Sequence, residues 1–369
     1  MPTYADPVGG RALPAESLRT WTAAVLERHA TPTDIAADVA EVLVAADRRA
    51  IASHGTARLP QYLALIEAGT MDPSARPEQV RSKAAIELFD AHNGWGHHAS
   101  RVAMDAAIEG ARKTGSYTAV VRASNHFGIA GWYALRAADA GLIGVSMTNT
   151  SPLVAATRGV DPVLGTNPLA VAAPAGRRVH FCLDMATSTI TRGKVEVASR
   201  RHEQLQPGWA IDAAGRPTTD PAAAFEGALL PLGGVEETGG HKGYGLTLVV
   251  DLLSGVLGGS TAAPLIIPLF STRDGAADLG QVFIAIDPDA IDEPGAFERR
   301  LEAELDLLVA ARTAPDAPDR ILIPGEPEAK AESRSDARGV VIDVEHHANL
   351  VEVGDRVGVP FPATTSIGL

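Results

Sequence analysis

The middle of the chain alternates short apolar runs with amphipathic segments, which leaves few folds open to it. The apolar runs end in polar or glycine residues, as β-strands do, whereas the amphipathic segments repeat apolar residues at helical spacing. This alternation predicts a mixed α/β layer. The expected strands cover residues 117–121, 142–147, 179–184 and 281–286, and the expected helices cover 100–113, 132–140 and 246–257, the last of them apolar and buried.

A helical region is predicted before this layer. The segment Thr31-Pro32-Thr33-Asp34 offers a helix N-terminus with a proline in the first turn. The helical pattern runs on to the breaker Gly55, so Ser53 and His54 should lie near a helix end, where polar side chains can face a cleft. The face expected to pack inward consists of Ile35, Val39, Val42, Leu43 and Ala46.

The length of the chain predicts more than one core. A chain of 369 residues exceeds what a single hydrophobic core usually supports, so we expect two lobes. Between residues 313 and 338 the composition shifts to Pro, Ala, Glu and Arg, which predicts exposed loops. A short α/β segment is expected from Val340 onward.

Composition excludes several classes of partner. The net charge is −13 at pH 7 and no basic stretch stands out, so nucleic acid is not expected to bind. Residues 246–270 are apolar but interrupted by Asp251 and two prolines, whereas a membrane span needs about twenty apolar residues. The single cysteine, Cys182, rules out an internal disulfide framework, and the first six residues lack the pattern of a signal peptide. We therefore expect a cytoplasmic protein.

Familiar catalytic and binding motifs do not occur in the chain. Gly-x-Gly-x-x-Gly is missing, and the glycine-rich stretch 239–245 has no Ser or Thr after its lysine, so it is not a Walker A loop. Glycines and a lysine at a helix start suit an anion such as a dinucleotide phosphate, but they also suit a tight turn. No metal site is expected, because no zinc or calcium ligand pattern is present and His346-His347 falls in a polar tail expected at the surface. The Gly-x-Ser-x-Gly elbow of serine hydrolases is missing too.

Two histidines have a context that suits chemistry. Ser53-His54-Gly55 places a hydroxyl beside an imidazole, which suits proton transfer near neutral pH. Arg58 follows the glycine break, and its planar guanidinium can bind a carboxylate through two hydrogen bonds. The second histidine, His126, follows the expected strand 117–121. Proton transfer on a substrate with a carboxylate is one interpretation, and buried structural histidines are the other.

Read in order, these stretches resemble the malate/L-lactate dehydrogenase family of NAD(P)-dependent oxidoreductases, and the resemblance spans nearly the whole chain. The family that the chain resembles also includes ureidoglycolate, sulfolactate and diketogulonate enzymes and Δ1-piperideine-2-carboxylate reductases. The motifs are Ala46-Asp47 through Ser53-His54-Gly55 to Arg58-Leu59-Pro60-Gln61-Tyr62, Ser124-Asn125-His126-Phe127-Gly128, Met147 to Pro152, Leu164-Gly165-Thr166-Asn167-Pro168, Leu183 to Ser188, Arg192-Gly193-Lys194, Pro207 to Ala210, His241 to Leu246 and Pro324-Gly325-Glu326.

The resemblance implies an α/β (α+β) fold that is not a Rossmann fold, with a helical lobe and a mixed-sheet cofactor lobe, in a homodimer. We expect a helical substrate and dimerisation lobe at residues 1–118, a cofactor lobe at 119–300 and a C-terminal segment at 301–369 that returns to the first lobe. The implied catalytic residues are Ser53, His54 and His126, and the implied substrate residues are Arg58, Thr166, Arg192 and Gly193. The implied residues around NAD or NADP, with NADPH slightly favoured, are His126, Phe127, Gly128, Ile129, Ala130, Asp184, Met185, Ala186, His241, Lys242, Pro324, Gly325 and Glu326.

The implied activity is hydride transfer between the nicotinamide and C2 of a small 2-oxo or 2-hydroxy acid. A cyclic imino acid reductase is the alternative, and a non-catalytic cofactor-binding relative is a further one. Relatives differ over whether the histidine at position 54 or 126 moves the proton, so both are retained. The chain departs from its relatives at Asn93 to His98, where His97 and His98 could reshape the substrate pocket or face solvent at a helix N-terminus.

Overall fold

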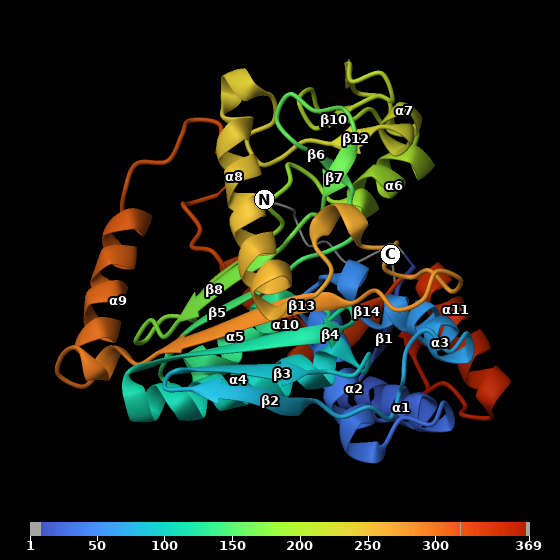
Figure 1. Cartoon of the computed structure of the whole chain (residues 1–369), viewed down its shortest axis with the longest axis horizontal. Coiled ribbons are helices and arrows are strands. Elements are labelled where there is room, and N and C mark those ends of the chain that lie inside the picture. Colours follow the sequence, from blue (N-terminus) through green and yellow to red (C-terminus); the bar gives the residue numbers. More distant parts are fainter. Residues whose placement is uncertain (1–8, 318, 367–369) are drawn as a thin grey trace.

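A seven-stranded sheet forms the centre of the computed structural model, which describes residues 9–317 and 319–366 (Figure 1). Only β3 and β4 pair in parallel, and every other neighbouring pair in this sheet is antiparallel. The strands, in spatial order, are β2 (Glu78–Lys83), β3 (Ile86–Asp90), β4 (Ser116–Ser124), β13 (Leu279–Ile286), β5 (Ile143–Thr148), β8 (Leu169–Ala173) and β9 (Phe181–Met185).

Helices cover both faces of this sheet. Helices α4 (Gly96–Thr114) and α5 (Ala130–Asp139) pack on one face, and α8 (Gly240–Asp251), continued by a π-helical turn at Leu252–Val256, packs on the other. Successive residues of β4 show the two-sided burial: Ala119 and Val121 join the core under α4 and α5, whereas Val120 joins the core under α8. The expected mixed α/β layer is confirmed.

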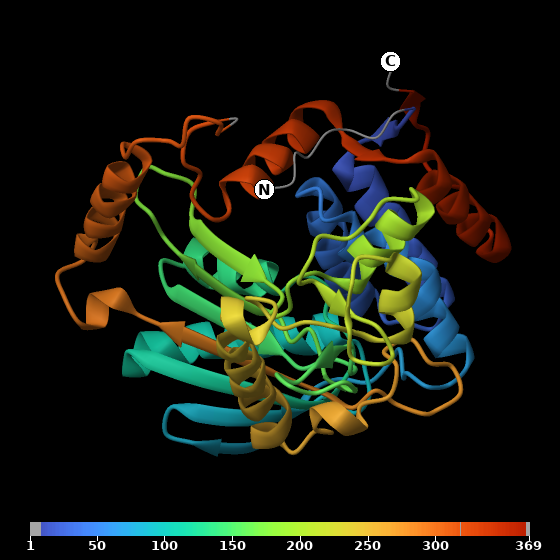
Figure 2. The ribbon, with the colours of Figure 1, turned by 90° about the horizontal axis from the view of Figure 1, so that it is seen from above.

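The two ends of the chain meet in a helical region. Helices α1 (Ala15–Arg28), α2 (Thr33–Arg48), α3 (Leu59–Glu67) and α11 (Val344–Val357) share one apolar core. A three-stranded sheet joins them, with β1 (Arg11–Leu13) between β14 (Val340–Ile342) and β15 (Thr365–Ser366). Viewed from above, the C-terminal α11 lies beside the N-terminal helices (Figure 2). The expected inward face of α2 is confirmed, because all five of its apolar residues are fully buried.

A smaller unit of short strands lies beside α8 (Figure 1). Its core includes Val154, Leu164, Val195 and Leu229. Its strands, in spatial order, are β11 (Pro217–Thr218), β10 (Ala210–Ile211), β12 (Ala228–Leu229), β6 (Val154–Ala155) and β7 (Pro162–Leu164), with helices α6 (Arg192–Arg200) and α7 (Pro221–Glu226). Two further helices, α9 (Ala296–Val309) and α10 (Glu326–Arg338), follow β13.

Two expectations about elements are wrong. Residues 326–338 form helix α10 instead of exposed loops, because Ala331 on its inner side is buried and α10 packs on α2. The apolar helix expected at 246–257 begins earlier, at Gly240, and one of its faces is exposed. No helix in the described ranges is long and apolar enough to cross a membrane. The first six residues lie outside those ranges, and the division into three segments at 118 and 300 stays a prediction.

Candidate functional site

The segment between α2 and α3 folds into two tight 3-10 turns, Ala52–His54 and Thr56–Arg58, separated by Gly55. Gly55 is required there because a Cβ atom would lie 1.9 Å from Oδ1 of Asp47. Within the turns, Oγ of Ser53 lies 2.8 Å from Nδ1 of His54. Nε of Arg58 donates to the carbonyl oxygen of Ser53 at 2.7 Å, which ties the second turn to the first.

His126 meets this segment from the central sheet. It lies in the loop between β4 and α5, and its ring stacks on that of His54 with ring centres 5.5 Å apart and planes 26° apart. The guanidinium of Arg58 lies over Phe270, whose ring also contacts His126. The structure therefore brings Ser53, His54, Arg58 and His126 into one cluster, although they come from two distant parts of the sequence.

Nδ1 of His126 has two neighbours that define its hydrogen-bonding role. The hydroxyl of Tyr62 lies 2.6 Å away, and the backbone N–H of Gly128 donates to the same nitrogen at 3.3 Å. A backbone N–H can only donate, so Nδ1 must accept. In the neutral ring the proton is then on Nε2, and His126 presents an N–H donor on the side of the ring away from Tyr62.

The cluster keeps its histidines uncharged. Burial, together with the neighbouring Arg58 guanidinium, lowers the pKa of His54 to about 4. Burial lowers the pKa of His126 well below its usual value, and the nearby His54, His97 and Arg58 lower it further. The pKa of Tyr62 is raised well above its usual value by burial, so its hydroxyl stays protonated. Arg58 is thus the one side chain of these that is charged at neutral pH.

His97 forms part of the wall of the cluster. It is fully buried in the first turn of α4, its ring meets Tyr62 edge-on at 5.2 Å, and it also lies near His126. Neither of its ring nitrogens has a hydrogen-bond partner among the described residues, and burial lowers its pKa to about 3. His98 is also buried, with Nδ1 2.7 Å from Oδ2 of Asp38. The solvent-facing alternative for these two residues is therefore wrong.

The residues expected around a nicotinamide cofactor gather at three glycine-rich helix starts. At the start of α5, Oδ2 of Asp184 accepts the N–H of Gly131 at 2.8 Å, and Gly128 has φ +81°. Asp184 therefore caps the first turn of α5. At the start of α10, Gly325 has φ +93°, and its Cβ would lie 2.9 Å from Cβ of Cys182. The N–H groups of a helix start can hold phosphate groups, which is the chemistry that a dinucleotide would use at these two starts.

The remaining expected cofactor residues differ in their burial and in their hydrogen bonds. The ring of Phe127 stacks on Tyr133 in the core, and the whole residue is buried. Ile129 and Ala130 are also buried at the start of α5. Met185 ends β9 and Ala186 follows it, and both are half-buried. Pro324 accepts the backbone N–H of Cys182 at 3.0 Å. The carboxylate of Glu326 accepts the N–H of Ile323 at 3.1 Å and forms ion pairs with Arg320 at 3.0 Å and with Arg178 at 3.7 Å.

The third glycine-rich start, at α8, has a structural role of its own. The loop before α8 approaches so closely that a Cβ on Gly240 would lie 1.9 Å from the carbonyl oxygen of Gly234, and one on Gly243 would lie 2.1 Å from that of Leu232. These glycines are therefore needed for the tight turn. His241 and Lys242 remain exposed in the first turn, where they are accessible to an anion.

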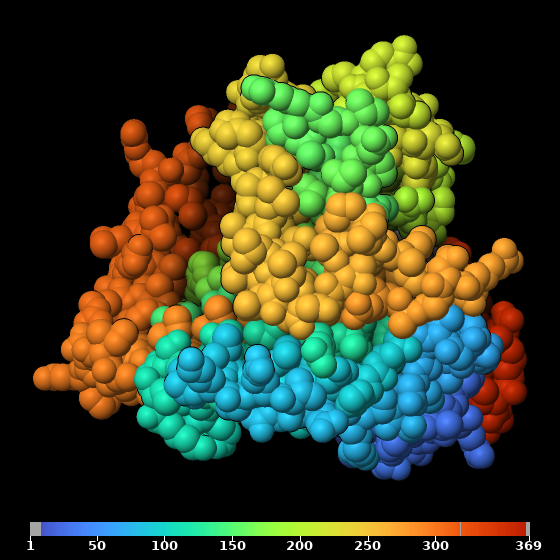
Figure 3. All heavy atoms as spheres, viewed as in Figure 1, coloured from blue at the N-terminus to red at the C-terminus, as the bar shows by residue number. Residues whose placement is uncertain are grey.

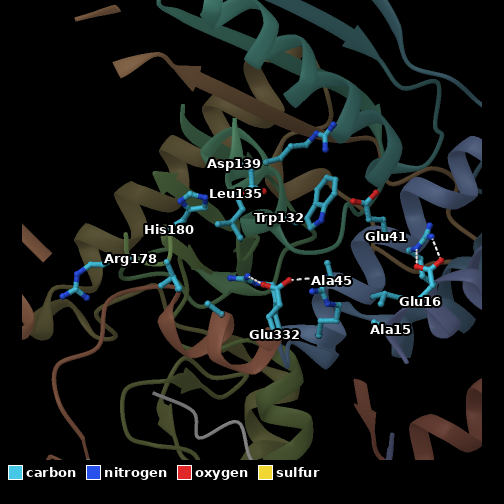
Figure 4. A pocket seen from close by; sticks show the side chains of 18 residues that line it. Ala15, Glu16, Glu41, Ala45, Trp132, Leu135, Asp139, Arg178, His180 and Glu332 are labelled. Carbon is cyan, nitrogen blue, oxygen red and sulfur yellow. Dashed lines mark hydrogen bonds and ion pairs between the residues drawn. The ribbon is translucent and has the colours of Figure 1, made fainter. Parts of the chain in front are cut away.

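A cavity of about 820 Å³ lies beside Gly325, between α1 and α2 on one side and α5 and α10 on the other (Figure 4). Figure 4 shows Trp132 and Leu135 of α5 across from Glu332 of α10. Its volume falls in the range of small-molecule sites. Its charged lining residues nearly balance: Arg19, Arg48, Arg49, Arg136 and Arg178 against Glu16, Glu41, Asp139 and Glu332.

Three expected substrate residues lie apart from the histidines. Thr166 is half-buried beside Thr150 and accepts the backbone N–H of Thr187 at 2.8 Å through its carbonyl oxygen. Arg192 begins α6 and lies over the ring of Phe225, and Gly193 follows it with open space where a side chain would be. No hydrogen bond or ring contact joins them to His54 or His126 in the part of the chain that the structure describes.

Several contributors to the cluster were missed by sequence reasoning as site residues. Tyr62 bonds His126, Phe270 packs against His126 and Arg58, and Asp47 and His346 both contact Thr56, the first residue of the second turn. Tyr62 and Asp47 fall inside the stretches that carry the family resemblance, which was a usable signal. His346 offered none, and its expected surface position is wrong, because it is buried against Thr56.

Residues 9–317 and 319–366 contain no group of three or more His, Cys, Asp or Glu side chains arranged to hold an ion. The histidine cluster has instead one cation, several neutral rings and a tyrosine. Such a set of side chains can bind an anion and transfer a proton.

Comparison with known proteins identifies the family. The sequence pattern described as Malate/L-lactate dehydrogenase matches residues 13–351. A malate dehydrogenase from Pyrococcus abyssi is 41% identical over 349 residues, which cover 94% of this chain and 95% of that protein.

Two solved structures share the fold over nearly their whole length. The malate dehydrogenase of Pyrococcus horikoshii OT3 has a TM-score of 0.89 and 36% identity, covering 97% of this chain and 99% of its own. The delta1-piperideine-2-carboxylate reductase of Pseudomonas syringae has a TM-score of 0.83 and 31% identity, covering 93% and 99%. With the histidine cluster and the mixed sheet already described, these matches show that the chain belongs to the malate/L-lactate dehydrogenase family.

Proposed function

We propose that the protein is an NAD(P)-dependent oxidoreductase that transfers hydride between the nicotinamide and C2 of a small 2-oxo or 2-hydroxy acid. The observation that supports this most is the stacked His54–His126 pair beside the guanidinium of Arg58. Arg58 can bind the carboxylate of the substrate. The two neutral imidazoles can hold or move a proton at the oxygen on C2, the carbon next to that carboxylate.

In the proposed mechanism, Arg58 binds the substrate carboxylate and the two imidazoles face the oxygen on C2. The Nε2–H of His126 donates a hydrogen bond to that oxygen and draws negative charge onto it. His54 carries the proton that the oxygen gains in reduction and loses in oxidation, and Ser53 at its Nδ1 relays that proton toward solvent. When bound, the nicotinamide cofactor supplies or accepts the hydride at C2.

We propose that the cofactor lies along the starts of α5 and α10. Gly128 to Gly131, Asp184 and Gly325 would hold it, and Lys242 and His241 would meet its phosphates. The cavity beside Gly325 offers room for the adenosine half. Thr166, Arg192 and Gly193 are proposed to border the substrate from the smaller unit.

A substrate panel with NADH and NADPH tests the function. Loss of reduced-nicotinamide absorbance with pyruvate-like or malate-like oxo acids supports the proposal. Turnover of cyclic imino acids alone would favour the second candidate, which the structural match to a piperideine-2-carboxylate reductase supports. If a thermal-shift titration shows cofactor binding but neither oxo acids nor cyclic imino acids are turned over, the protein is a non-catalytic relative. The same titration with both cofactors compares their affinities.

We propose further that the protein acts as a homodimer in the cytoplasm. Leu248, Val249, Leu252 and Val256 lie on one face of α8 and its continuation, and each is between 41% and 58% exposed. Figure 3 shows this segment running over the front of the molecule. A contiguous apolar face of this kind marks a protein interface. A second copy of the chain is the partner that the family resemblance favours.

A further inference from the structure

A buried chain of three side chains lies beneath the two turns that hold His54 and Arg58. Oγ1 of Thr56 lies 2.6 Å from Oδ2 of Asp47 and 3.1 Å from Nε2 of His346. The backbone N–H of Thr56 also donates to Oδ2 of Asp47, at 2.9 Å. All three residues are at most 7% exposed, and they come from α2, the second turn and α11.

The donors and acceptors in this chain can be assigned. The Asp47 carboxylate only accepts, so the one hydroxyl proton of Thr56 points to Oδ2. Oγ1 of Thr56 must then accept from His346, which places a proton on Nε2 of His346. Thr56 thus accepts one hydrogen bond from His346 and donates one to Asp47, so all donors in the chain point from His346 toward Asp47. A hydrogen bond to a buried carboxylate is stronger than a neutral one, so the chain holds Thr56 firmly.

Thr56 is placed where such an anchor affects both functional side chains. It lies two residues after His54 and two before Arg58, with its own side chain directed away from theirs into the interior. Gly55, next to it, packs against the other oxygen of Asp47. Arg58 is tied back to the carbonyl oxygen of Ser53. A shift of Thr56 would therefore move His54 and Arg58 together.

We propose that Asp47, Thr56 and His346 are positioning residues that set the place of His54 and Arg58 from within the helical region. His346 connects the C-terminal helix α11 to the turns that follow α2, because its Nε2 bonds the side chain of Thr56. None of the three is proposed to touch substrate or cofactor. The proposal rests on the proposed function for its kinetic consequences, but its effect on the backbone of residues 52–58 does not depend on that function.

Paired substitutions separate positioning from general stability. Thr56→Val and His346→Leu remove the hydrogen bonds, whereas Thr56→Ser keeps the hydroxyl and His346→Gln keeps a donor near the Nε2 position. His347→Leu is the matched control, since His347 lies next to His346 on α11 but packs against Phe361. The measurements are kcat and KM for the oxo acid, the Kd of the cofactor, and hydrogen–deuterium exchange of residues 52–58.

We expect Thr56→Val and His346→Leu to lower kcat and raise the KM for the oxo acid, so that kcat/KM falls by about tenfold to a hundredfold, because small misplacements are costly in catalysis. The cofactor Kd should change less than about twofold, and residues 52–58 should exchange faster. Thr56→Ser, His346→Gln and His347→Leu should stay within about threefold of the parent protein in kcat/KM.

Three results would overturn the proposal: unchanged exchange of residues 52–58 in both disruptive variants, equal losses in His346→Leu and His347→Leu, or no rescue by the conservative changes. If the parent protein reduces no oxo acid and no imino acid, the proposed function fails. In that case, hydrogen–deuterium exchange of residues 52–58 alone tests the positioning role. A thermal melt of each variant confirms that the compared proteins are folded.

Discussion

The hydroxyl of Tyr62 lies 2.6 Å from Nδ1 of His126 and joins a helix of the helical region to the loop that follows β4. With the N–H of Gly128 donating to the same nitrogen, this contact holds the ring of His126 and keeps its proton on Nε2. The Nε2–H of His126, in the plane of a ring that stacks on His54, is thereby ready to donate a hydrogen bond. The contact makes the orientation of a residue in the sheet layer depend on a residue in the helical region.

Loss of this hydroxyl should weaken turnover and leave cofactor binding unchanged. In Tyr62→Phe we expect kcat to fall by about tenfold, since a hydrogen bond within a protein contributes about 0.5–1.5 kcal/mol. The cofactor Kd measured by calorimetry should stay constant. Tyr117→Phe, at a half-buried tyrosine on the far part of β4, is the control. A kcat equal to that of the parent protein would show that Tyr62 does not orient His126.

Replacing the proposed carboxylate anchor by a point charge should raise the KM for the acid. In Arg58→Lys we expect an increase of about tenfold or more, because a charge-assisted hydrogen bond contributes about 1.5–3 kcal/mol and lysine cannot make the paired contact. Arg76→Lys is the control, at an exposed ion pair with Asp34. Steady-state kinetics with oxo acids decides the matter, and an unchanged KM together with an unchanged kcat argues against the assignment.

The two reaction directions should respond differently to pH. His54 has its pKa lowered to about 4, so above that pH the free protein holds it neutral. Reduction needs a proton on the cluster, so kcat/KM for reduction should fall as pH rises from 5 to 8, by up to about tenfold per unit. Oxidation needs the neutral ring, so its kcat/KM should stay level over this range and drop only near pH 4. Parallel pH profiles in both directions would contradict this role for His54.

The close approach at Gly55 should make that position intolerant of a side chain. In Gly55→Ala the new Cβ would lie 1.9 Å from Oδ1 of Asp47, and overpacking of this kind costs about 1–3 kcal/mol of unfolding free energy. Gly245→Ala is the control, because no atom outside the neighbouring backbone of its own helix lies within 4 Å of the Cβ it would add. Urea denaturation measures both. Equal stability of the two variants would mean that Asp47 can move aside without cost.

The exposed face of α8 should mediate dimer formation. A charge at Leu252, which is 56% exposed, should convert the dimer to a monomer in Leu252→Glu, because burying an unpaired carboxylate in an apolar interface is unfavourable. Leu307→Glu is the control, at an even more exposed leucine on α9. Light scattering coupled to size exclusion gives the masses. A parent protein that is already monomeric would refute the dimer.

Much of the fold could be predicted from local pattern. The inward face of α2 and the strands β4, β5 and β13 appeared where periodicity placed them, because a strand or helix buries a face that repeats at its own period. Helix α10 did not, since its polar composition matches that of a loop and contacts with α2 stabilise it as a helix. Ala331 is buried, and Arg48 and Arg49 pair with acidic side chains of α10. Its mostly polar surface carries too few apolar residues for a periodic signal.

The sequence alone pointed to the family, the mixed sheet, and Ser53, His54, Arg58 and His126 as candidate site residues, because these depend on local motifs and on spacing along the chain. Three features appear only in the folded chain: the contact of His346 with Thr56 across 290 positions, the contact of Tyr62 with His126, and the exposed apolar face of α8. Such contacts depend on which surfaces meet after folding. Residues far apart in sequence carry no local signal of their partner, so their roles follow from three-dimensional packing alone.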